Sequence, residues 1–179
     1  IPSNLYAMDS IISTDEYSPF TKKLTVCGIT LIAREDVSDI FMMRVGKTIS
    51  EMFLIYDVTD TIKQKNLLKN LYKYSTVIPL FYGENWGFHP NEESEWDELN
   101  NKYSICDIIM EGVPNPVMEV VEHILHHITD IGFHFTDIDN WGLTNSSRLF
   151  SFTQEAIKFG YYDVIQYEDI KETGFRNRI

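Results

Sequence analysis

Apolar residues cluster in three short segments that predict the strands of a sheet. Leu24–Ala33 is rich in β-branched residues and almost continuously apolar, which is typical of a strand buried on both faces. Thr76–Tyr82 and Ser104–Met110 are the other two candidates, and Asp107 interrupts the last one. Pro79 cannot donate a ladder hydrogen bond, so it indicates either an edge strand or a bulge.

Two amphipathic segments between these strands predict helices. Ser38 or Asp36 can cap a helix that runs to about Phe53, and Asp60 can cap another that runs to about Tyr74. We expect the core-facing positions of the two helices to be Ile40, Phe41, Val45, Ile49, Met52, Ile62, Leu67, Leu68 and Leu71.

The remaining segments complete an α+β pattern. Residues 1–22 are polar and weakly patterned, which predicts an extended N-terminal arm. A charged, exposed helix is expected at 91–103 and a further helix at 146–160. Residues 23–179 have the length of one domain. We therefore expect a small mixed sheet packed with helices, in a single α/β domain.

A histidine-rich helix is the most informative segment. Asn115 suits the N-cap, Pro116 suits the first turn, and Gly132 suits a left-handed C-terminal cap after about Ile131. One side of this helix is apolar and contains Val117, Val121, Ile124, Leu125, Ile128 and Ile131. The other side is polar and contains Glu119, Glu122, His123, His126, His127 and Asp130.

Two pairs on the polar side have the spacing of metal ligands. Glu122 with His126 and His123 with His127 are each four residues apart, so the members of a pair are neighbours on the helix surface. Imidazole and carboxylate groups bind zinc, and a flanking carboxylate can orient a ring or activate a bound water. The alternative is a polar face that only contacts solvent.

The sequence resembles zincin-like metallopeptidases, in particular secreted bacterial domains of the anthrax lethal factor catalytic type. The similar parts are the first apolar strand with Val37–Phe41 after it, the core helix at Val120–His134, and Ser146–Asp163. The resemblance implies a zincin-like fold whose central helix bears the histidines. It also implies a site for zinc or another divalent metal and a metal-dependent hydrolase of peptides or proteins.

The motif itself departs from the family pattern. In that family, the core helix carries H-E-x-x-H, in which the two histidines bind zinc and the glutamate is the general base. Here the order is Glu122-His123-Ile124-Leu125-His126. In this register Glu122 and His126 take the ligand positions and His123 takes the base position, so the resemblance makes Glu122 and His123 the catalytic candidates.

Shifting the register by one residue gives a different ligand pair. His123 and His127 then become the ligands, but Ile124 stands where the catalytic glutamate should be. In either register, His134 and Glu155 are the candidates for a third ligand from outside the motif. Because the departure affects the catalytic positions, the second hypothesis is a non-catalytic relative that keeps the fold for binding or structure.

Composition narrows the range of partners. Fifteen basic and 27 acidic residues give a formal net charge of −12, which repels phosphates and makes nucleic acid a poor partner. The longest apolar runs are about half of the ~20 residues that a membrane span needs. The first residue is Ile1 rather than Met, so either a leader has been removed, as in a mature secreted or periplasmic protein, or the sequence starts inside a longer chain.

Two cysteines and two Trp/Gly segments leave alternatives open. Cys27 and Cys106 could form one disulfide, or they could pack as free thiols in buried strands. The segments Gly83–His89 and Asp139–Gly142 could line a substrate cleft, or their aromatic rings could anchor loops to the core.

Overall fold

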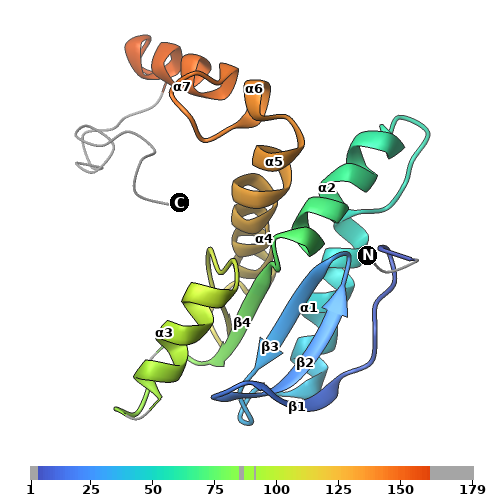
Figure 1. Ribbon diagram of the computed structural model, residues 1–179, viewed down its shortest axis with the longest axis vertical. Helices are drawn as coiled ribbons and strands as arrows, with labels where there is room; N and C mark the ends of the chain where they lie inside the picture. The colour runs from blue at the N-terminus through green and yellow to red at the C-terminus, as the bar shows by residue number, and fades with distance from the viewer. Residues whose placement is uncertain (1–3, 85–86, 91, 162–179) are drawn as a thin grey trace.

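The computed structural model in Figure 1 describes residues 4–84, 87–90 and 92–161 and contains one mixed five-stranded sheet. Its strand order is β1-β2-β3-β4-β5, in which β1, β2 and β3 are antiparallel neighbours and β4 and β5 continue parallel to β3. The strands are β1 (Ile12–Tyr17), β2 (Phe20–Val26), β3 (Ile29–Ala33), β4 (Val77–Tyr82) and β5 (Ile109–Glu111). The expected mixed sheet is confirmed.

Helices cover both faces of this sheet. The helical elements are α1 (Asp39–Met52), α2 (Thr61–Lys73), α3 (Glu93–Lys102), α4 (Pro116–His127), η1 (Ile128–Phe133), α5 (His134–Thr136), α6 (Ile138–Trp141) and α7 (Arg148–Lys158). One core cluster lies between the sheet and the helices α1, α2, α4 and η1. A second, smaller cluster lies between the opposite face and α3. The molecule therefore has three layers, with α3 alone on its side.

The first apolar segment is a hairpin and not the single strand that was predicted. β2 and β3 pair as antiparallel neighbours, with Val26 opposite Ile29. Between them, Cys27 and Gly28 both have positive φ, at 51° and 78°, which is the requirement of a two-residue type I′ turn. The continuous apolarity hid this turn, because Cys27 is a small apolar residue and only Gly28 signals a break.

The sheet also begins earlier and ends differently from the prediction. Residues 12–17 belong to the segment expected as an extended arm, but they form β1 and pair with β2. β4 lies inside the sheet between β3 and β5, so Pro79 is not on an edge strand. The short β5 pairs with β4 only from Leu80 onward. Pro79 therefore sits just before the β4–β5 ladder, where the loss of a donor is tolerated.

Both predicted helix caps after the hairpin are confirmed. The Ser38 side chain accepts from the backbone N–H of Phe41, and the Asp60 side chain accepts from that of Lys63. The predicted inward positions are right for the middle of each helix but wrong near the start. Ile40 and Ile62 are 68% and 74% exposed, whereas Met42, which was not predicted to face the core, is fully buried.

The histidine helix starts where it was predicted but continues further. Asn115 is the N-cap of α4, as predicted, but it has a positive φ of 56° and its side chain makes no capping bond. The helix continues through the π-helical turn η1 and the short α5. Gly132 lies inside η1 and is not a C-cap. A Cβ there would come within 2.9 Å of Leu67 Cγ, so the glycine allows η1 to pack closely on α2.

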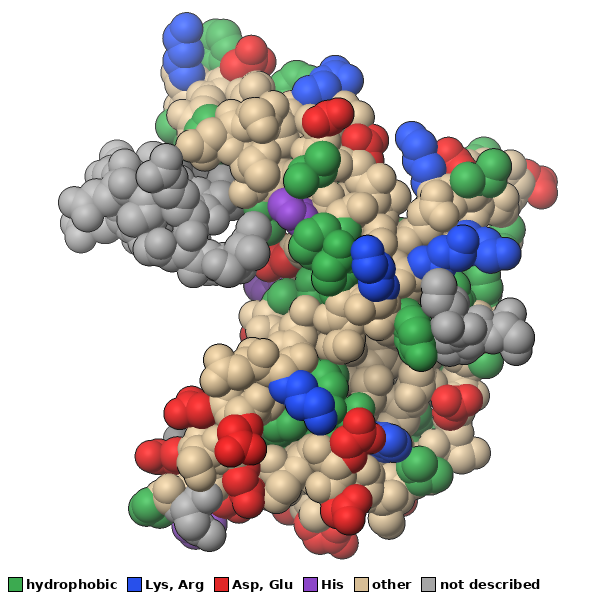
Figure 2. All heavy atoms as spheres, viewed as in Figure 1, with side chains coloured by type: hydrophobic (Ala, Val, Ile, Leu, Met, Phe, Trp, Pro, Cys, Tyr) green, Lys and Arg blue, Asp and Glu red, His purple; other side chains and the backbone are tan. Residues whose placement is uncertain are grey.

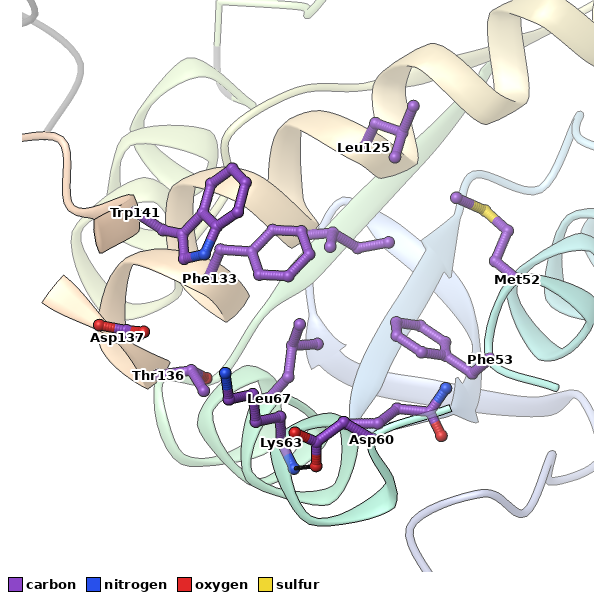
Figure 3. Close-up of a pocket in the computed structure, with 12 residues that line it drawn as sticks. Met52, Phe53, Asp60, Lys63, Leu67, Leu125, Phe133, Thr136, Asp137 and Trp141 are labelled. Carbon is purple, nitrogen blue, oxygen red and sulfur yellow. Dashed lines mark hydrogen bonds between the residues drawn. The ribbon is translucent and has the colours of Figure 1, made fainter. Parts of the chain in front are cut away.

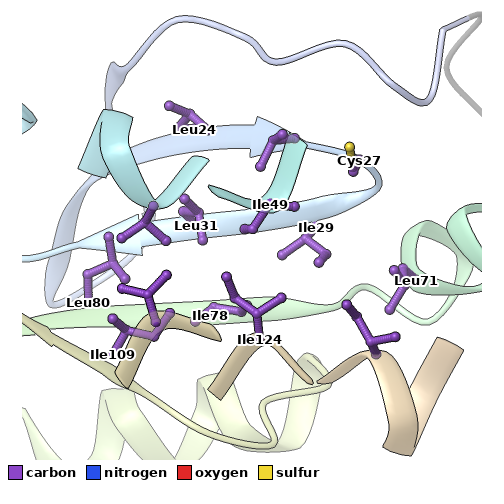
Figure 4. Packing of buried hydrophobic residues seen from close by; sticks show 14 of the residues in the cluster. Leu24, Cys27, Ile29, Leu31, Ile49, Leu71, Ile78, Leu80, Ile109 and Ile124 are labelled. Carbon is purple, nitrogen blue, oxygen red and sulfur yellow. The ribbon is translucent and has the colours of Figure 1, made fainter. Parts of the chain in front are cut away.

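Figure 4 shows how α4 is fastened to the sheet. Ile124 points from α4 toward Ile78, Leu80 and Ile109 of β4 and β5, and all four side chains are fully buried. Leu125, which was predicted to share this stripe, is 42% exposed. The buried stripe of the helix is therefore Val120, Ile124, His127, Ile128 and Ile131.

Two further helices lie where they were predicted. α3 and α7 lie within the two ranges expected to be helical. None of the α7 side chains is buried, and this helix contacts α6. None of the helices in the described ranges combines the length and the apolarity needed to cross a bilayer.

Candidate metal site on the histidine helix

His127 is fully buried, although it was predicted to lie on a polar face and bind metal. Its Nδ1 hydrogen-bonds to the carbonyl oxygen of His123 at 3.0 Å. Its Nε2 accepts from the backbone N–H of Cys106 at 3.1 Å and from that of Asp107 at 3.4 Å. Both ring nitrogens are thus engaged by the backbone, and His127 is not a free metal ligand.

The electrostatics of His127 agree with this structural role. Burial lowers the pKa of its imidazole to about 4, against an ordinary value of 6.5. The ring is therefore neutral near pH 7, with one nitrogen donating and the other accepting. A proton on Nε2 would face the two backbone N–H groups that this atom now accepts.

His127 fixes the segment that was predicted as the third strand. Only one residue of Ser104–Ile108 bridges the sheet, Ser104 opposite Thr76, and β5 begins at Ile109. The intervening residues leave the ladder and run along α4, where His127 satisfies two of their N–H groups. Asp107 interrupts the apolar pattern because its side chain faces the histidines of α4.

Asp107 bridges two imidazoles. Its Oδ2 lies 2.5 Å from His126 Nδ1 and 2.7 Å from His123 Nδ1. Its Oδ1 accepts from the backbone N–H of Ile108 at 2.9 Å, which sets the orientation of the carboxylate. The two rings are edge to face, with centroids 5.9 Å apart.

Glu119 lies on the far side of the His123 ring. Its Oε1 is 3.1 Å from His123 Nε2, one helical turn away. His123 therefore lies between two carboxylates, with Asp107 at Nδ1 and Glu119 at Nε2. The side chains of His123 and Glu119 are each 18% exposed, so this arrangement is largely shielded from water.

The proximity of these groups shifts their pKa values in opposite directions. Burial favours the neutral form of His123, but the carboxylates of Asp107 and Glu119 outweigh it and raise the pKa of the imidazole. Burial also opposes ionisation of Asp107, but its contacts with His123, with the Ile108 N–H and with His126 lower the pKa of the carboxyl group. The cluster thus favours a protonated, positively charged His123 ring beside an ionised Asp107 carboxylate.

The donor set fits a divalent metal ion. One nitrogen each of His123 and His126 and one oxygen of Asp107 lie within 4.8 Å of one another. Two imidazoles and a carboxylate are common ligands of zinc and related ions. Ligands of a tetrahedral zinc ion lie about 3.4 Å apart, so the side chains would spread slightly around an ion.

The buried Nδ1 of His123 lies 2.7 Å from the Asp107 carboxylate and hydrogen-bonds to it when it carries a proton. A metal ion would instead take the lone pair of this nitrogen and could be held by the same carboxylate.

The structure brings together only two of the residues predicted as ligands. His123 and His126 join the cluster, but at a spacing of three residues and not four. Glu122 is exposed and outside it. Neither predicted i, i+4 pair therefore forms the cluster, because the polar face turns His127 inward and Glu122 toward solvent.

The two predicted third ligands are also elsewhere. His134 is buried, and its Nδ1 accepts from the backbone N–H of Leu143 at 2.9 Å, so it anchors the loop after α6. Glu155 is exposed on α7. The third member of the cluster is Asp107, which was not predicted as a ligand. Its signal in the sequence was a carboxylate inside an apolar run.

The cysteines do not form the disulfide that was left open as an alternative. Cys27 is buried in the β2–β3 turn, Cys106 is exposed beside the cluster, and both thiols are free. Burial raises the pKa of the Cys27 thiol to about 11, so it packs as a neutral apolar side chain.

Comparisons of this chain with protein-family models, with curated proteins and with solved structures gave no match. Function is therefore inferred from the side chains of Asp107, Glu119, His123 and His126.

Proposed function

We propose that this protein is a metal-dependent hydrolase that binds zinc or a related divalent ion at Asp107, His123 and His126. The observation that carries the proposal is the convergence of these donors from two separate segments within 4.8 Å. The 18% exposure of the His123 side chain, which partly shields these donors from water, supports it. Peptides or proteins are the proposed substrates, on the resemblance to zincin-like metallopeptidases.

Each residue of the cluster would supply one ligand atom to the metal ion. His123 and His126 would offer Nδ1, and Asp107 would offer Oδ2. Three protein ligands leave a coordination position for water or substrate, as in catalytic zinc sites. A bound ion would polarise a carbonyl group and lower the pKa of a water molecule.

Glu119 would act as a positioning residue in this site. Its contact with His123 Nε2 would keep that nitrogen protonated and leave Nδ1 with its lone pair directed at the ion. This role replaces the general base that the H-E-x-x-H resemblance assigns, because Glu122 is exposed and lies outside the cluster.

A non-catalytic function has one observation in its favour. His126 Nδ1 and Asp107 Oδ2 already form a hydrogen bond, and His127 fastens the same segment to α4. The cluster could therefore serve as a clamp between the 104–108 segment and the helix, in a domain that binds a partner.

Metal titration of the purified, chelator-treated protein tests the metal site. Calorimetry with zinc, manganese and nickel near pH 7.5 should show one equivalent bound at micromolar concentration or tighter. Asp107→Asn should weaken binding at least tenfold, whereas the matched control Glu122→Gln should bind like the wild type. No uptake by the wild type, or equal loss in both variants, would overturn the site.

Peptide cleavage distinguishes the hydrolase from the clamp. The zinc-loaded protein should cleave members of a mixed peptide library, detected by mass spectrometry, and Asp107→Asn should lose this activity while retaining its unfolding transition in urea. Metal binding without cleavage would favour the non-catalytic function.

A further inference from the structure

An apolar pocket lies between the end of α1, the first half of α2 and the segment from Leu125 to Trp141. Its volume is about 370 Å³, which is at the lower end of the range for small-molecule sites. Figure 3 shows Phe53 and Met52 on one side of it, Phe133 and Trp141 on the other, and Leu125 above. The rings of Phe133 and Trp141 stack with centroids 5.4 Å apart and form a flat wall.

Most polar groups at this pocket already have partners. Both carboxylate oxygens of Asp137 accept from the Asn140 side chain. The Thr136 hydroxyl donates to the Gly132 carbonyl and accepts from Asn70. Gln64 Oε1 accepts from the hydroxyl of Tyr6. These groups complete the fold and are not available to a ligand.

Asp60 also lines the pocket, and its Oδ1 accepts from the backbone N–H of Lys63. The side chain of Lys63 differs from these groups. It lines the pocket but makes no ion pair with any residue in the described part of the chain. In Figure 3 its side chain runs from the start of α2 toward the Phe133 and Trp141 side of the pocket. An ammonium group at the margin of an apolar cavity attracts a ligand that has an apolar body and one negative charge.

The charge around the pocket is mixed, on a chain whose net charge is −12. The α2 sequence, TIKQKNLLKNLYK, contains four lysines and no acidic residue, but Asp60 and Asp137 line the pocket together with Lys63. In Figure 2, blue side chains lie over the region of α2, and red side chains lie beside them. Because Asp60 caps α2 and Asp137 bonds to Asn140, Lys63 is the group that would bind a carboxylate.

A π-helical turn supplies part of the wall. Ile128 and Phe133 are the first and last residues of η1, and both line the pocket. π-helical turns are rare and occur frequently at functional sites. Here the wider turn places Phe133 against Trp141 and Ile128 against the pocket floor.

We propose that this pocket binds a small amphipathic carboxylate, such as a medium-chain fatty acid, with its apolar chain against Phe53, Phe133 and Trp141 and its carboxylate at Lys63. The pocket shares no residue with the metal cluster. The proposal therefore does not depend on the proposed hydrolase.

Calorimetric titration with decanoate, kept below its critical micelle concentration, tests the site, with decanol as the neutral probe of equal length. Decanoate should bind one site and about threefold or more tightly than decanol, since a partly exposed ion pair contributes that factor. Equal binding of the two probes, or binding of neither at millimolar concentration, would overturn the proposal.

Two pairs of variants locate the bound molecule. Lys63→Gln should remove the preference for decanoate over decanol, whereas Lys65→Gln, on the same helix but outside the pocket, should retain it. Leu125→Asp should weaken both probes about tenfold or more. Its control, Val117→Asp, changes a 72% exposed residue of α4 away from the pocket and should have little effect.

If Lys63→Gln and Lys65→Gln behave alike, the carboxylate is not recognised by Lys63. If Leu125→Asp leaves binding unchanged, the molecule is bound elsewhere. Either result contradicts the proposal. Both lysines are exposed, so these variants should fold as the wild type does, which urea unfolding will verify.

Discussion

The backbone N–H of Cys106 donates a hydrogen bond to Nε2 of the buried His127, 3.1 Å away and 21 residues later in the chain. This bond, together with the weaker one from Asp107, holds the segment before β5 against α4. It places the Asp107 carboxylate between His123 and His126. His127, which was predicted as a metal ligand, therefore holds Asp107 beside the two other histidines and does not join their cluster.

The low pKa of His127 predicts acid-sensitive stability. Its folded value of about 4 lies below the unfolded value of 6.5, so the unfolded state binds the proton more tightly. The stabilisation is fully present above pH 6.5 and is lost as the pH falls toward 4. Between pH 7 and 4.5 the free energy of unfolding should fall by about 2 kcal/mol from this group.

Urea unfolding at the two pH values measures this change. His127→Gln removes the titrating group, so the variant should be less stable at pH 7 but should lose less stability on acidification. The lowered pKa of Asp107 affects stability below about pH 4, and the raised pKa of His123 affects it above about pH 6.5. Neither group therefore explains a loss of stability between about pH 6.5 and 4.5. An identical pH dependence in wild type and variant would show that another group is responsible.

Sequence periodicity predicted the helix but assigned its faces with an error of one residue. The assignment assumed that every histidine is on the solvent side. In the structure the buried stripe runs through Ile124 and includes His127, while Leu125 lies outside it. Hydrophobicity alone could not show this, because a histidine can be buried when both of its nitrogens bond to backbone groups.

Alanine substitutions should separate these two neighbouring positions. Ile124 is fully buried between α4 and the sheet, so Ile124→Ala should lower the free energy of unfolding by about 2–5 kcal/mol. Leu125 is 42% exposed, and Leu125→Ala should cost about 1 kcal/mol or less. Denaturant unfolding of the two variants gives the comparison, and a larger loss for Leu125→Ala would contradict the observed rotation of the helix.

The effect of Gly132→Ala on the free energy of unfolding should change sign when Leu67 is also replaced. An alanine there gains about 1 kcal/mol in helical propensity, but its Cβ would come within 2.9 Å of Leu67 Cγ. Overpacking costs about 1–3 kcal/mol, so Gly132→Ala should be destabilising overall. On the background of Leu67→Ala the contact is gone, and the same substitution should stabilise by about 1 kcal/mol. A double-mutant cycle in urea checks this, and additive effects would rule out the close contact.

Local signals in the sequence were reliable where capping and periodicity decided the structure. Ser38 and Asp60 begin helices as predicted. The errors arose where a long-range contact decided it. The Cys27–Gly28 turn lies within an apolar run, and Gly132 is required by Leu67, 65 residues earlier in the chain.

The cluster of Asp107, His123 and His126 was predicted only in part for the same reason. His123 and His126 were named because they share a helix, which is visible in one segment of sequence. Asp107 comes from a separate segment that His127 holds in place, and no local pattern reports that contact. The carboxylate in an apolar run was the available signal, and it indicated an interrupted strand.

Glu119 provides a test of the proposed geometry at His123. Its carboxylate lies 3.1 Å from Nε2 of this ring, on the side opposite Asp107. If His123 binds the ion through Nδ1, Glu119→Gln should weaken zinc affinity by about 10-fold to 100-fold, as loss of a carboxylate that orients a histidine ligand does. Calorimetric titration gives the affinity, and urea unfolding of the metal-free variant shows whether the fold is retained.

The matched control is Glu122→Gln, which removes the same charge one turn along the helix at an exposed position outside the cluster. A general loss of negative charge would weaken binding equally in both variants, whereas orientation of His123 weakens it only in Glu119→Gln. Glu119→Asp should recover part of the affinity, because it keeps the carboxylate but shortens its reach. If Glu119→Gln binds zinc as tightly as the wild type, His123 does not use Nδ1 and the proposed arrangement of ligands is wrong.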